Sequence, residues 1–215
     1  GIEQTGMFGA VAAADHHLFS NERQRWFYLG LLAMAGVDLR HNSGSVVPLV
    51  APEAPRRRRP KSPLFVMGGV AWPWQDPTEA LSTTLKVLNK HRKGKIVVYG
   101  GRPIIGNTKV VDLPSSVPAS KRLEYRGATS WDKLLNAYSG ATAALDVMAP
   151  NPEREVALAF RHVEYLACGL PIVTGPTHSL APAIRDTRSG WVAENGDLAE
   201  CVLDAFDHLL FLNLI

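Results

Sequence analysis

Short apolar runs alternate with longer amphipathic segments from Leu64 onward, and this rhythm constrains the fold more than any other feature of the sequence. The apolar runs suit buried strands, whereas the segments between them place apolar residues at helical spacing. The predicted strands are Leu64–Met67, Lys95–Tyr99, Leu123–Arg126, Ala143–Val147, Leu170–Thr174 and Trp191–Ala193. Strands that alternate with helices in this way form parallel sheets. We therefore predict an α/β domain with a Rossmann-like, doubly wound parallel sheet.

The segment before the strand Leu170–Thr174 is the most informative part of that pattern. Apolar residues recur in it at helical spacing, as Val156, Phe160, Val163 and Ala167. We predict one helix over this segment, from Asn151 to Cys168, which Gly169 ends.

Arg161 and Glu164 lie one turn apart on the second face of this predicted helix. They are either a solvated ion pair or ligand-binding side chains beside the sheet. The spacing of the two residues leaves both interpretations open, and the solvated pair is the commoner arrangement on protein surfaces.

Residues 1–50 look like the end of a separate α/β unit. We predict a short helix over residues 6–14, a strand over residues 17–20, and a helix through Ala35 that Ser20 or Asn21 caps and Gly36 ends. This last helix is apolar nearly all round, so we expect it to be well buried. The strands that should precede such a unit are not in the sequence, and we interpret the chain as a fragment.

Residues 51–63, APEAPRRRRPKSP, interrupt the regular pattern. Their prolines exclude a continuous helix or a central strand, so we predict an extended linker. The four arginines, Arg56–Arg59, could contact phosphate or an anionic membrane surface. A solvated linker that keeps its backbone extended is the favoured interpretation.

The composition is that of an ordinary globular protein, with 46% hydrophobic and 20% charged residues. A net charge of +3 permits anionic ligands without requiring nucleic acid, so no nucleic-acid partner is expected. Cys168 and Cys201 have no CxxC partner, which favours a reducing compartment and disfavours zinc.

The hydropathy of the sequence bears on its location. Because no apolar run approaches the length of a bilayer and residue 1 opens a polar stretch, we expect neither a membrane span nor a signal peptide. We expect a cytoplasmic location, with possible peripheral contact at the inner face of the membrane.

Glycines follow the first three predicted strands, as Gly68-Gly69, Gly100-Gly101 and Gly127. In a parallel sheet these ends meet at the carboxyl edge, where tight turns and helix N-termini bind ligands. Backbone amides and a guanidinium would hold a diphosphate there, and a carboxylate such as Glu164 suits the hydroxyls of a ribose. These residues together indicate a nucleotide-like ligand.

The order of segments over Leu123–Leu209 resembles a known family, through LEYRGATSW, EYLACGLPIVTG and SGWVAENGD. It is similar to the C-terminal, donor-binding half of GT-B glycosyltransferases, closest to the retaining group-one enzymes of glycosyltransferase family four. Leu64–Gly101 resembles the opening of that half, and Ala13–Leu49 the last helical unit of the N-terminal half. The resemblance divides the chain into the end of an acceptor domain (1–50), a linker (51–63) and a donor-binding domain (64–215).

The resemblance implies transfer of a sugar from a nucleoside diphosphate sugar to a hydroxyl acceptor, with retention and without a metal or other cofactor. The acceptor (a sugar, lipid or protein) and the oligomeric state are not specified by it. The donor-binding residues that it implies are Gly68, Gly69 and Val70 at the diphosphate, Gly127 and Ala128 at the base, and Glu164 at the ribose.

The sequence departs from the family at the phosphate-binding cations. The family commonly has an arginine beside the first glycine turn and a lysine a few residues later, where this chain has Gly69 and the segment AWPWQ. The family also has a glutamate eight residues before the ribose glutamate, where this chain has Val156.

We therefore expect other charged residues to take over these roles. Our hypothesis is that Arg161, together with Arg154, binds the diphosphate, and that Glu153 or Glu155 approaches the donor sugar. Arg161, Glu153 and Glu155 are thus the candidate catalytic residues. The alternative for Arg154 and Glu155 is that they are solvated charges in the first turn of a helix.

Aromatic and histidine side chains offer weaker signals. Trp72-Pro73-Trp74 could stack on a base or an acceptor sugar, or pack between the two half-domains. His162 and His178 lie near the expected sugar site, but a single histidine in such a place is more often a hydrogen-bonded structural residue than a base.

Two other functional classes remain open. A GT-B-type nucleotide-sugar epimerase would use the same half-fold for a different reaction. A non-catalytic nucleotide-binding domain would explain the missing phosphate-binding cations. A nucleic-acid role based on Arg56–Arg59 is the least favoured interpretation.

Overall fold

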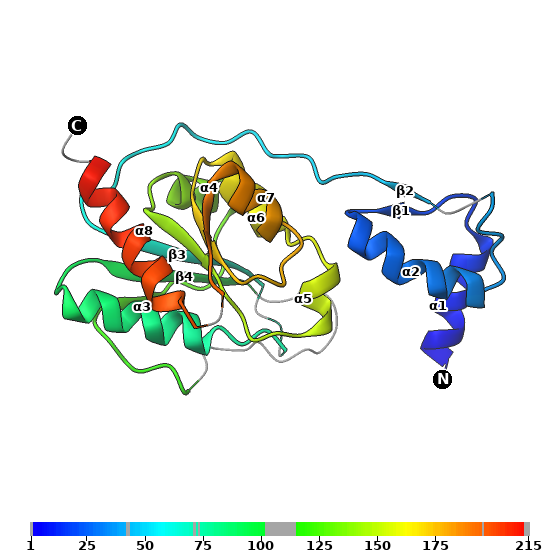
Figure 1. The fold of residues 1–215 in the computed structure, drawn as a ribbon, viewed down its shortest axis with the longest axis horizontal. Helices are drawn as coiled ribbons and strands as arrows, with labels where there is room; N and C mark the ends of the chain where they lie inside the picture. The colour runs from blue at the N-terminus through cyan, green and yellow to red at the C-terminus, as the bar shows by residue number, and fades with distance from the viewer. Residues whose placement is uncertain are drawn as a thin grey trace.

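The computed structural model describes residues 2–41, 44–70, 72, 74–101, 115–194 and 196–212. A small N-terminal unit and a larger α/β domain are joined by an extended segment (Figure 1). Within the described residues, no helix combines the length and the apolar composition needed to cross a bilayer.

The larger domain is built on a six-stranded sheet with the order β5-β4-β3-β6-β7-β8, in which all neighbouring strands are parallel. The strands are β3 (Leu64–Val70), β4 (Lys95–Gly101), β5 (Leu123–Tyr125), β6 (Ala143–Asp146), β7 (Ile172–Thr174) and β8 (Gly190–Val192). The strand order reverses direction between β3 and β6, which is the point where doubly wound sheets bind ligands. The predicted fold class is confirmed.

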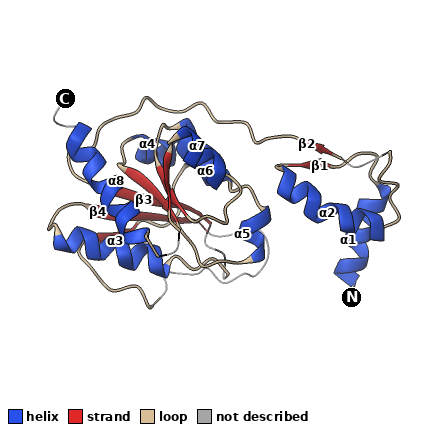
Figure 2. Ribbon diagram, in the orientation of Figure 1, coloured by secondary structure: helices blue, strands red, loops and turns tan. Residues whose placement is uncertain are grey.

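Helices cover both faces of this sheet (Figure 2). On one face lie α3 (Thr78–Lys90) and α8 (Leu198–Leu212), and on the other α4 (Trp131–Ser139), α6 (Phe160–Ala167) and α7 (Ala181–Thr187). Successive strand residues point to opposite faces, so Phe65 and Met67 pack with α3 and α8 whereas Val66 packs on the other side. Two apolar cores result, and the sheet is buried between them.

The glycines of β3 do not form the predicted tight turn. Gly68 and Gly69 are part of the strand, where they lie opposite Tyr99 and Gly100 of β4. The prediction of a turn was therefore wrong, although Gly69 does have the positive φ of 115° that favours glycine.

The predicted single helix over Asn151–Cys168 is also wrong. The structure has a short helix, α5 (Pro152–Val156), followed by extended residues and then α6. Phe160, which the helical stripe placed in the core, is 71% exposed. Gly169, with a φ of 63°, ends α6 as expected.

Contacts from outside the helix account for the break. The Val156 carbonyl accepts a hydrogen bond from the Asn21 side-chain amide at 3.0 Å, and the Ala157 carbonyl accepts one from the Ser179 hydroxyl at 3.0 Å. Because these partners satisfy the carbonyls, the backbone can leave the helix without burying unpaired groups.

The N-terminal unit contains α1 (Ile2–Ala13), β1 (Leu18–Phe19), α2 (Glu22–Met34) and β2 (Ser45–Val46). The two strands pair in parallel, and the Asn21 side chain caps α2 by accepting from the Gln24 amide at 2.8 Å. The Arg23 guanidinium donates to the Thr177 carbonyl at 2.7 Å, which ties this unit to the larger domain.

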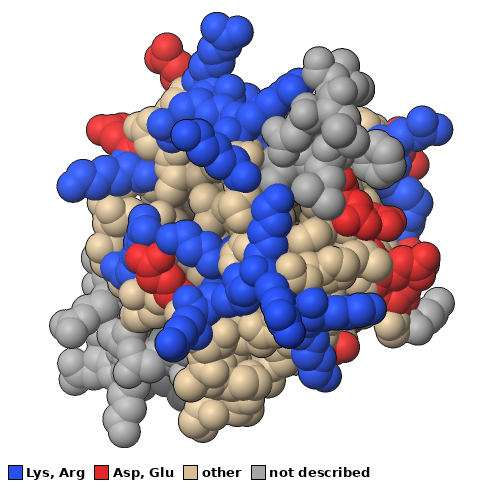
Figure 3. All heavy atoms as spheres, turned by 90° about the vertical axis from the view of Figure 1, so that its left-hand side faces the viewer, with Lys and Arg blue, Asp and Glu red and all other residues tan. Residues whose placement is uncertain are grey.

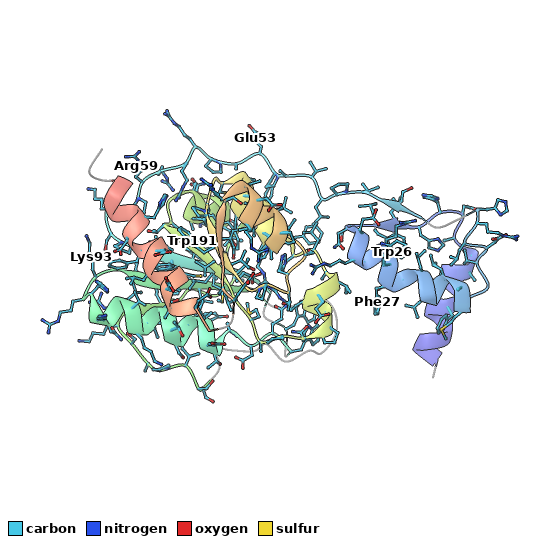
Figure 4. The ribbon with its side chains drawn as sticks, viewed as in Figure 1. Trp26, Phe27, Glu53, Arg59, Lys93 and Trp191 are labelled. Carbon is cyan, nitrogen blue, oxygen red and sulfur yellow. The ribbon has the colours of Figure 1, made fainter. Side chains whose placement is uncertain are left out.

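The expectation that α2 is well buried was wrong. Trp26 is 66% exposed and Phe27 is 55% exposed, and both project from α2 in Figure 4. Leu32 is the buried residue of this helix. The unit is too small to cover an apolar surface on every side of α2.

The segment before β3 is extended, as predicted, but it is not simply solvated. The Arg57 guanidinium donates to the carbonyls of Ser139 and Thr142 at 3.0 and 3.3 Å. The Arg58 amide donates to the Ser139 carbonyl at 2.8 Å. These bonds attach the segment to the end of α4, so the favoured interpretation of a solvated linker was wrong there.

Candidate functional site

A buried carboxylate lies at the point where the strand order reverses. Asp146 is the last residue of β6 and is only 1% exposed. One of its oxygens is 2.5 Å from Arg154 Nη2 and also contacts His162 Nε2, while the other is 3.3 Å from Arg161 Nε. Asp146 therefore holds three basic side chains that α5 and α6 supply.

Arg161 lies beside the glycines of β3, where the sequence hypothesis placed it. Its Nη1 donates to the Gly68 carbonyl at 3.1 Å, and its Nη2 donates to Gln75 Oε1 at 3.1 Å. A Cβ at Gly69 would lie 2.8 Å from Arg161 Nη1, so the absence of a side chain there makes room for the guanidinium. Arg161 is 8% exposed, so it is an interior residue.

Gly68 is surrounded by two tyrosines. Its amide donates to Tyr165 Oη at 2.9 Å, and a Cβ at this position would lie 1.8 Å from Tyr138 Oη. The rings of Tyr138 and Tyr165 pack edge to face with their centroids 4.7 Å apart. Gly68 and Gly69 are thus required by the protein's own side chains, independently of a ligand.

The electrostatics of this cluster keep Asp146 ionised. Burial by itself would raise the pKa of Asp146, but the charges of Arg161 and Arg154 and the hydrogen bond from His162 outweigh burial and hold that pKa well below its usual range. Burial lowers the pKa of His162, and it lowers the pKa of His178 to about 2. Both histidines are therefore neutral at neutral pH.

The two histidines pack against each other, with ring centroids 3.7 Å apart. His178 Nδ1 accepts from the Leu180 amide at 3.1 Å, which places the proton of the neutral ring on Nε2. His162 donates through Nε2 to the Asp146 carboxylate. Their hydrogen bonds agree with the structural role that the sequence favoured for them.

Asp146, His162 and His178 also bring three possible metal-ligand atoms within 4.8 Å of one another. The side-chain types would suit a divalent metal. However, both oxygens of Asp146 face a guanidinium, from Arg154 on one side and Arg161 on the other. A metal cation here would be repelled by these two charges, so the cluster is poorly suited to hold one.

Glu164 points in a different direction from Arg161. Its carboxylate accepts from Trp131 Nε1 at 2.9 Å, at the start of α4. It is partly exposed. The interpretation of Arg161 and Glu164 as a solvated ion pair was wrong, because Arg161 faces the sheet and Glu164 faces α4.

The three charged residues of α5 separate into two groups. Glu153 and Glu155 are exposed, whereas Arg154 is 5% exposed and bound to Asp146. The alternative of a solvated Arg154 was therefore wrong. Glu153 and Arg161 do not lie on one continuous helix, because the helix is broken between them.

The remaining predicted donor residues lie at strand ends. Val70 is the last residue of β3. Gly127 follows β5 with a φ of 65°, and the exposed Ala128 comes next, before α4 begins. Glu164 contacts the first residue of α4, so the structure brings Glu164 and the Gly127–Ala128 segment to the same end of that helix.

The tryptophan segment is only partly within the described residues, since Pro73 lies outside them. The rings of Trp72 and Trp74 are stacked with centroids 5.1 Å apart, and Trp74 is 49% exposed. The Asn151 side chain donates to the Trp74 carbonyl at 3.2 Å. Stacking on a ligand and packing between half-domains both remain predictions for this pair.

Asp146 was not predicted as a site residue from the sequence. A signal for it exists, because it is a charged residue that ends an otherwise apolar buried strand, Ala143–Asp146. A carboxylate in that position requires a buried partner. The arginines of α5 and α6 are those partners.

Comparisons with known proteins agree with this architecture. TarM matches with a TM-score of 0.66 over 98% of this chain, at 13% sequence identity. The pneumococcal O-GlcNAc transferase GtfA, solved with UDP and GlcNAc, matches with a TM-score of 0.64 over 96% at 13% identity. The lipopolysaccharide outer core galactosyltransferase WaaB matches with a TM-score of 0.53 over 93% at 16% identity.

The fold is that of a Rossmann-like half of a GT-B glycosyltransferase. The chain spans 40% of TarM and of GtfA, and 54% of WaaB. No family model and no curated protein matches the sequence. The resemblance noted in the sequence is therefore confirmed at the level of the fold.

Proposed function

We propose that this chain carries the donor site of a glycosyltransferase, which transfers a sugar from a nucleoside diphosphate sugar to a hydroxyl acceptor. The observation that carries the proposal is the convergence of Glu164, the Gly127–Ala128 segment and the β3 glycines on the carboxyl edge of a doubly wound sheet. This is the edge at which such sheets bind nucleotides. GtfA and the Anabaena protein HepE, which share the fold, were both solved with UDP.

In this proposal Glu164 holds the ribose, and the backbone at Gly127 and Ala128 contacts the base. Arg161 acts from beneath Gly69, where its guanidinium adds positive charge beside the diphosphate. Because Asp146 and Gln75 fix the guanidinium, its charge is in place before the leaving diphosphate develops negative charge.

Arg154 has a different role from the one that the sequence suggested. It neutralises Asp146 together with Arg161, so we propose that it positions the site and does not contact the donor. Glu153 and Glu155 are exposed and remain candidates to approach the donor sugar. We propose retaining, metal-independent transfer, with the acceptor bound by the part of the protein that precedes this domain.

Nucleotide binding tests the proposal directly. Titration calorimetry with UDP, GDP and their sugars should detect binding to the unmodified chain. Glu164→Gln should weaken it by about tenfold or more, since a hydrogen bond to a charged group is lost. Glu200→Gln, at an exposed position on α8, is the matched control and should bind normally.

Equal affinities for the Glu164 and Glu200 variants would remove the ribose assignment. Arg161→Lys keeps a cation beside Gly69 and should bind more weakly than the unmodified chain while remaining folded by circular dichroism. Normal binding by this variant would show that the guanidinium of Arg161 is not required at the diphosphate site.

A non-catalytic nucleotide-binding domain is the second candidate. The observation that favours it is that Arg161, which lies beside the β3 glycines, and Arg154 are both already engaged by Asp146. It predicts nucleotide binding by the full-length protein without release of free nucleoside diphosphate from a nucleotide sugar.

A further inference from the structure

The amino edge of the six-stranded sheet is strongly basic. Three segments meet there: the end of the linker, the turn between α3 and β4, and the residues just before β5. They contribute eight cations, which we call the basic face: Arg58, Arg59, Lys61, Arg92, Lys93, Lys95, Lys121 and Arg122. Figure 3 views the molecule from this side and shows Lys and Arg spread across it, with most of the visible Asp and Glu at the rim.

Backbone contacts hold the three segments together. The Lys95 amide donates to the Pro63 carbonyl at 3.0 Å, and the Ile96 amide donates to the Arg122 carbonyl at 2.7 Å. The Arg122 guanidinium donates to the Gly94 carbonyl at 2.9 Å. The cations are therefore carried by a rigid edge of the sheet and not by independent loops.

The positive charge of this face exceeds what Glu124, which lies beside it, can neutralise. Glu124 lies 2.9 Å from Lys95 Nζ, and it also pairs with Arg126 outside the face. The whole chain has 23 Lys and Arg against 20 Asp and Glu. Since the basic face holds eight of the cations, the rest of the chain carries more acidic than basic residues. This charge asymmetry orients the molecule toward an anionic surface.

The face is hollowed as well as charged. A cavity of about 910 Å³ is lined by Lys61, Lys95, Lys121 and Arg122, among other residues. Such a hollow can accept a phosphate headgroup, while the cations around it contact neighbouring headgroups. The labelled side chains of Arg59 and Lys93 lie at the same end of the molecule in Figure 4 and extend the charge beyond the cavity.

We propose that the basic face docks the protein on an anionic phospholipid surface. A broad distribution of cations over three segments fits a surface of many charges better than a single small anion. Parallel strands all begin at this edge, so docking here leaves the carboxyl edge with the candidate donor site facing away from the lipid. The inference is independent of the nature of the donor.

Vesicle binding tests the proposal. The protein should co-sediment with vesicles that contain phosphatidylglycerol or phosphatidylserine but not with neutral phosphatidylcholine vesicles, and binding should weaken as salt increases. Lys93→Glu/Lys121→Glu should reduce the affinity by roughly 25-fold or more, because each basic residue near an anionic surface contributes roughly fivefold.

The matched control is Arg40→Glu/Arg185→Glu, which makes the same change of net charge at exposed positions in the N-terminal unit and on α7. It should retain most of the binding. Equal losses in the two variants, or no binding of the unmodified protein to anionic vesicles at low salt, would overturn the proposal.

Tighter binding to duplex DNA or to a soluble anionic polysaccharide than to vesicles would also overturn it. Circular dichroism checks that both variants are folded. Nucleotide titration of the same variants keeps this test separate from that of the donor site, because neither pair of substitutions changes a residue proposed to bind the donor.

Discussion

The two edges of the six-stranded sheet handle positive charge in opposite ways. At the carboxyl edge, Arg154 and Arg161 are buried and both contact Asp146. At the amino edge, lysines such as Lys93 and Lys121 are exposed to solvent. A buried charge must be paired because desolvation is costly, whereas an exposed one needs no partner. The first arrangement gives a fixed internal charge, and the second gives a surface that can attract a partner.

Of the changes that test this contrast, removing the Asp146 carboxylate, which Arg154 and Arg161 share, should have the largest effect on stability. Asp146→Asn leaves two buried guanidinium groups without their anion, so we expect a loss of about 3–5 kcal/mol in the free energy of unfolding. Urea denaturation measures it. Asp132→Asn, at an exposed position in α4, is the control and should change stability by less than about 0.5 kcal/mol. A similar small change for Asp146→Asn would show that its buried contacts are not essential.

Adding a methyl group at Gly68, beside the buried residues around Asp146, should have the next largest effect on stability. In Gly68→Ala the new Cβ would lie 1.8 Å from Tyr138 Oη, so the strand or the ring must move. We expect a cost of about 1–3 kcal/mol in urea denaturation. Tyr138→Phe removes the oxygen and leaves Cζ, at 2.8 Å, as the nearest ring atom, so the double variant should lose less than the sum of the single ones. Additive losses would contradict the inferred clash.

Lowering the pH should reduce the free energy of unfolding, because His178 is buried and neutral beside His162 and Asp146. The folded protein holds His178 neutral with a pKa lowered to about 2, whereas a histidine in the unfolded chain titrates near a pKa of about 6.5. Below about pH 6.5 the unfolded chain binds more protons, so the free energy of unfolding falls as the pH is lowered, by up to ~1.4 kcal/mol per pH unit from this residue. Above that pH the contribution is constant.

Urea denaturation on both sides of the histidine pKa, at neutral and at mildly acidic pH, measures this slope. His178→Asn removes the titrating ring and should flatten the pH dependence. His41→Asn, at an exposed position, controls for the loss of a histidine. A slope that is the same in all three proteins would contradict the buried, neutral state of His178.

Changes at the amino edge should have the smallest effect on stability. Lys93→Gln and Lys121→Gln remove exposed charges, so each should change the free energy of unfolding by less than about 0.5 kcal/mol. Thermal and urea denaturation measure both. A loss of more than about 1 kcal/mol would mean that these lysines have structural partners and that the contrast between the two edges is weaker than we infer.

The alternation of strands and helices was predictable from the sequence because each strand is a short apolar run between turn residues. Leu64–Met67 and Lys95–Tyr99 both lie within observed strands, and Gly169 ends its helix as expected. The end of a helix that depends on local backbone preference is visible in the sequence. The break after Val156 is not, because Asn21 and Ser179, which are distant in the sequence, stabilise it.

The candidate site was predictable only in part. The spacing of Arg161 and Glu164 correctly placed both on one helix, but only Arg161 lies beside the β3 glycines, and the roles of both residues in ligand binding remain predictions. It did not show that Arg161 faces Asp146 while Glu164 faces Trp131. Side chains three residues apart on a helix point in directions about 60° apart, and the packing of the helix decides which of them is buried.

The sequence by itself determined the class of fold, because hydrophobic periodicity and turn residues are local properties of the chain. The tertiary structure decided which charges are buried, which are exposed and where a helix breaks. Those outcomes depend on desolvation and on contacts between segments far apart in the sequence, as Asp146 with Arg154 and Arg161 illustrates.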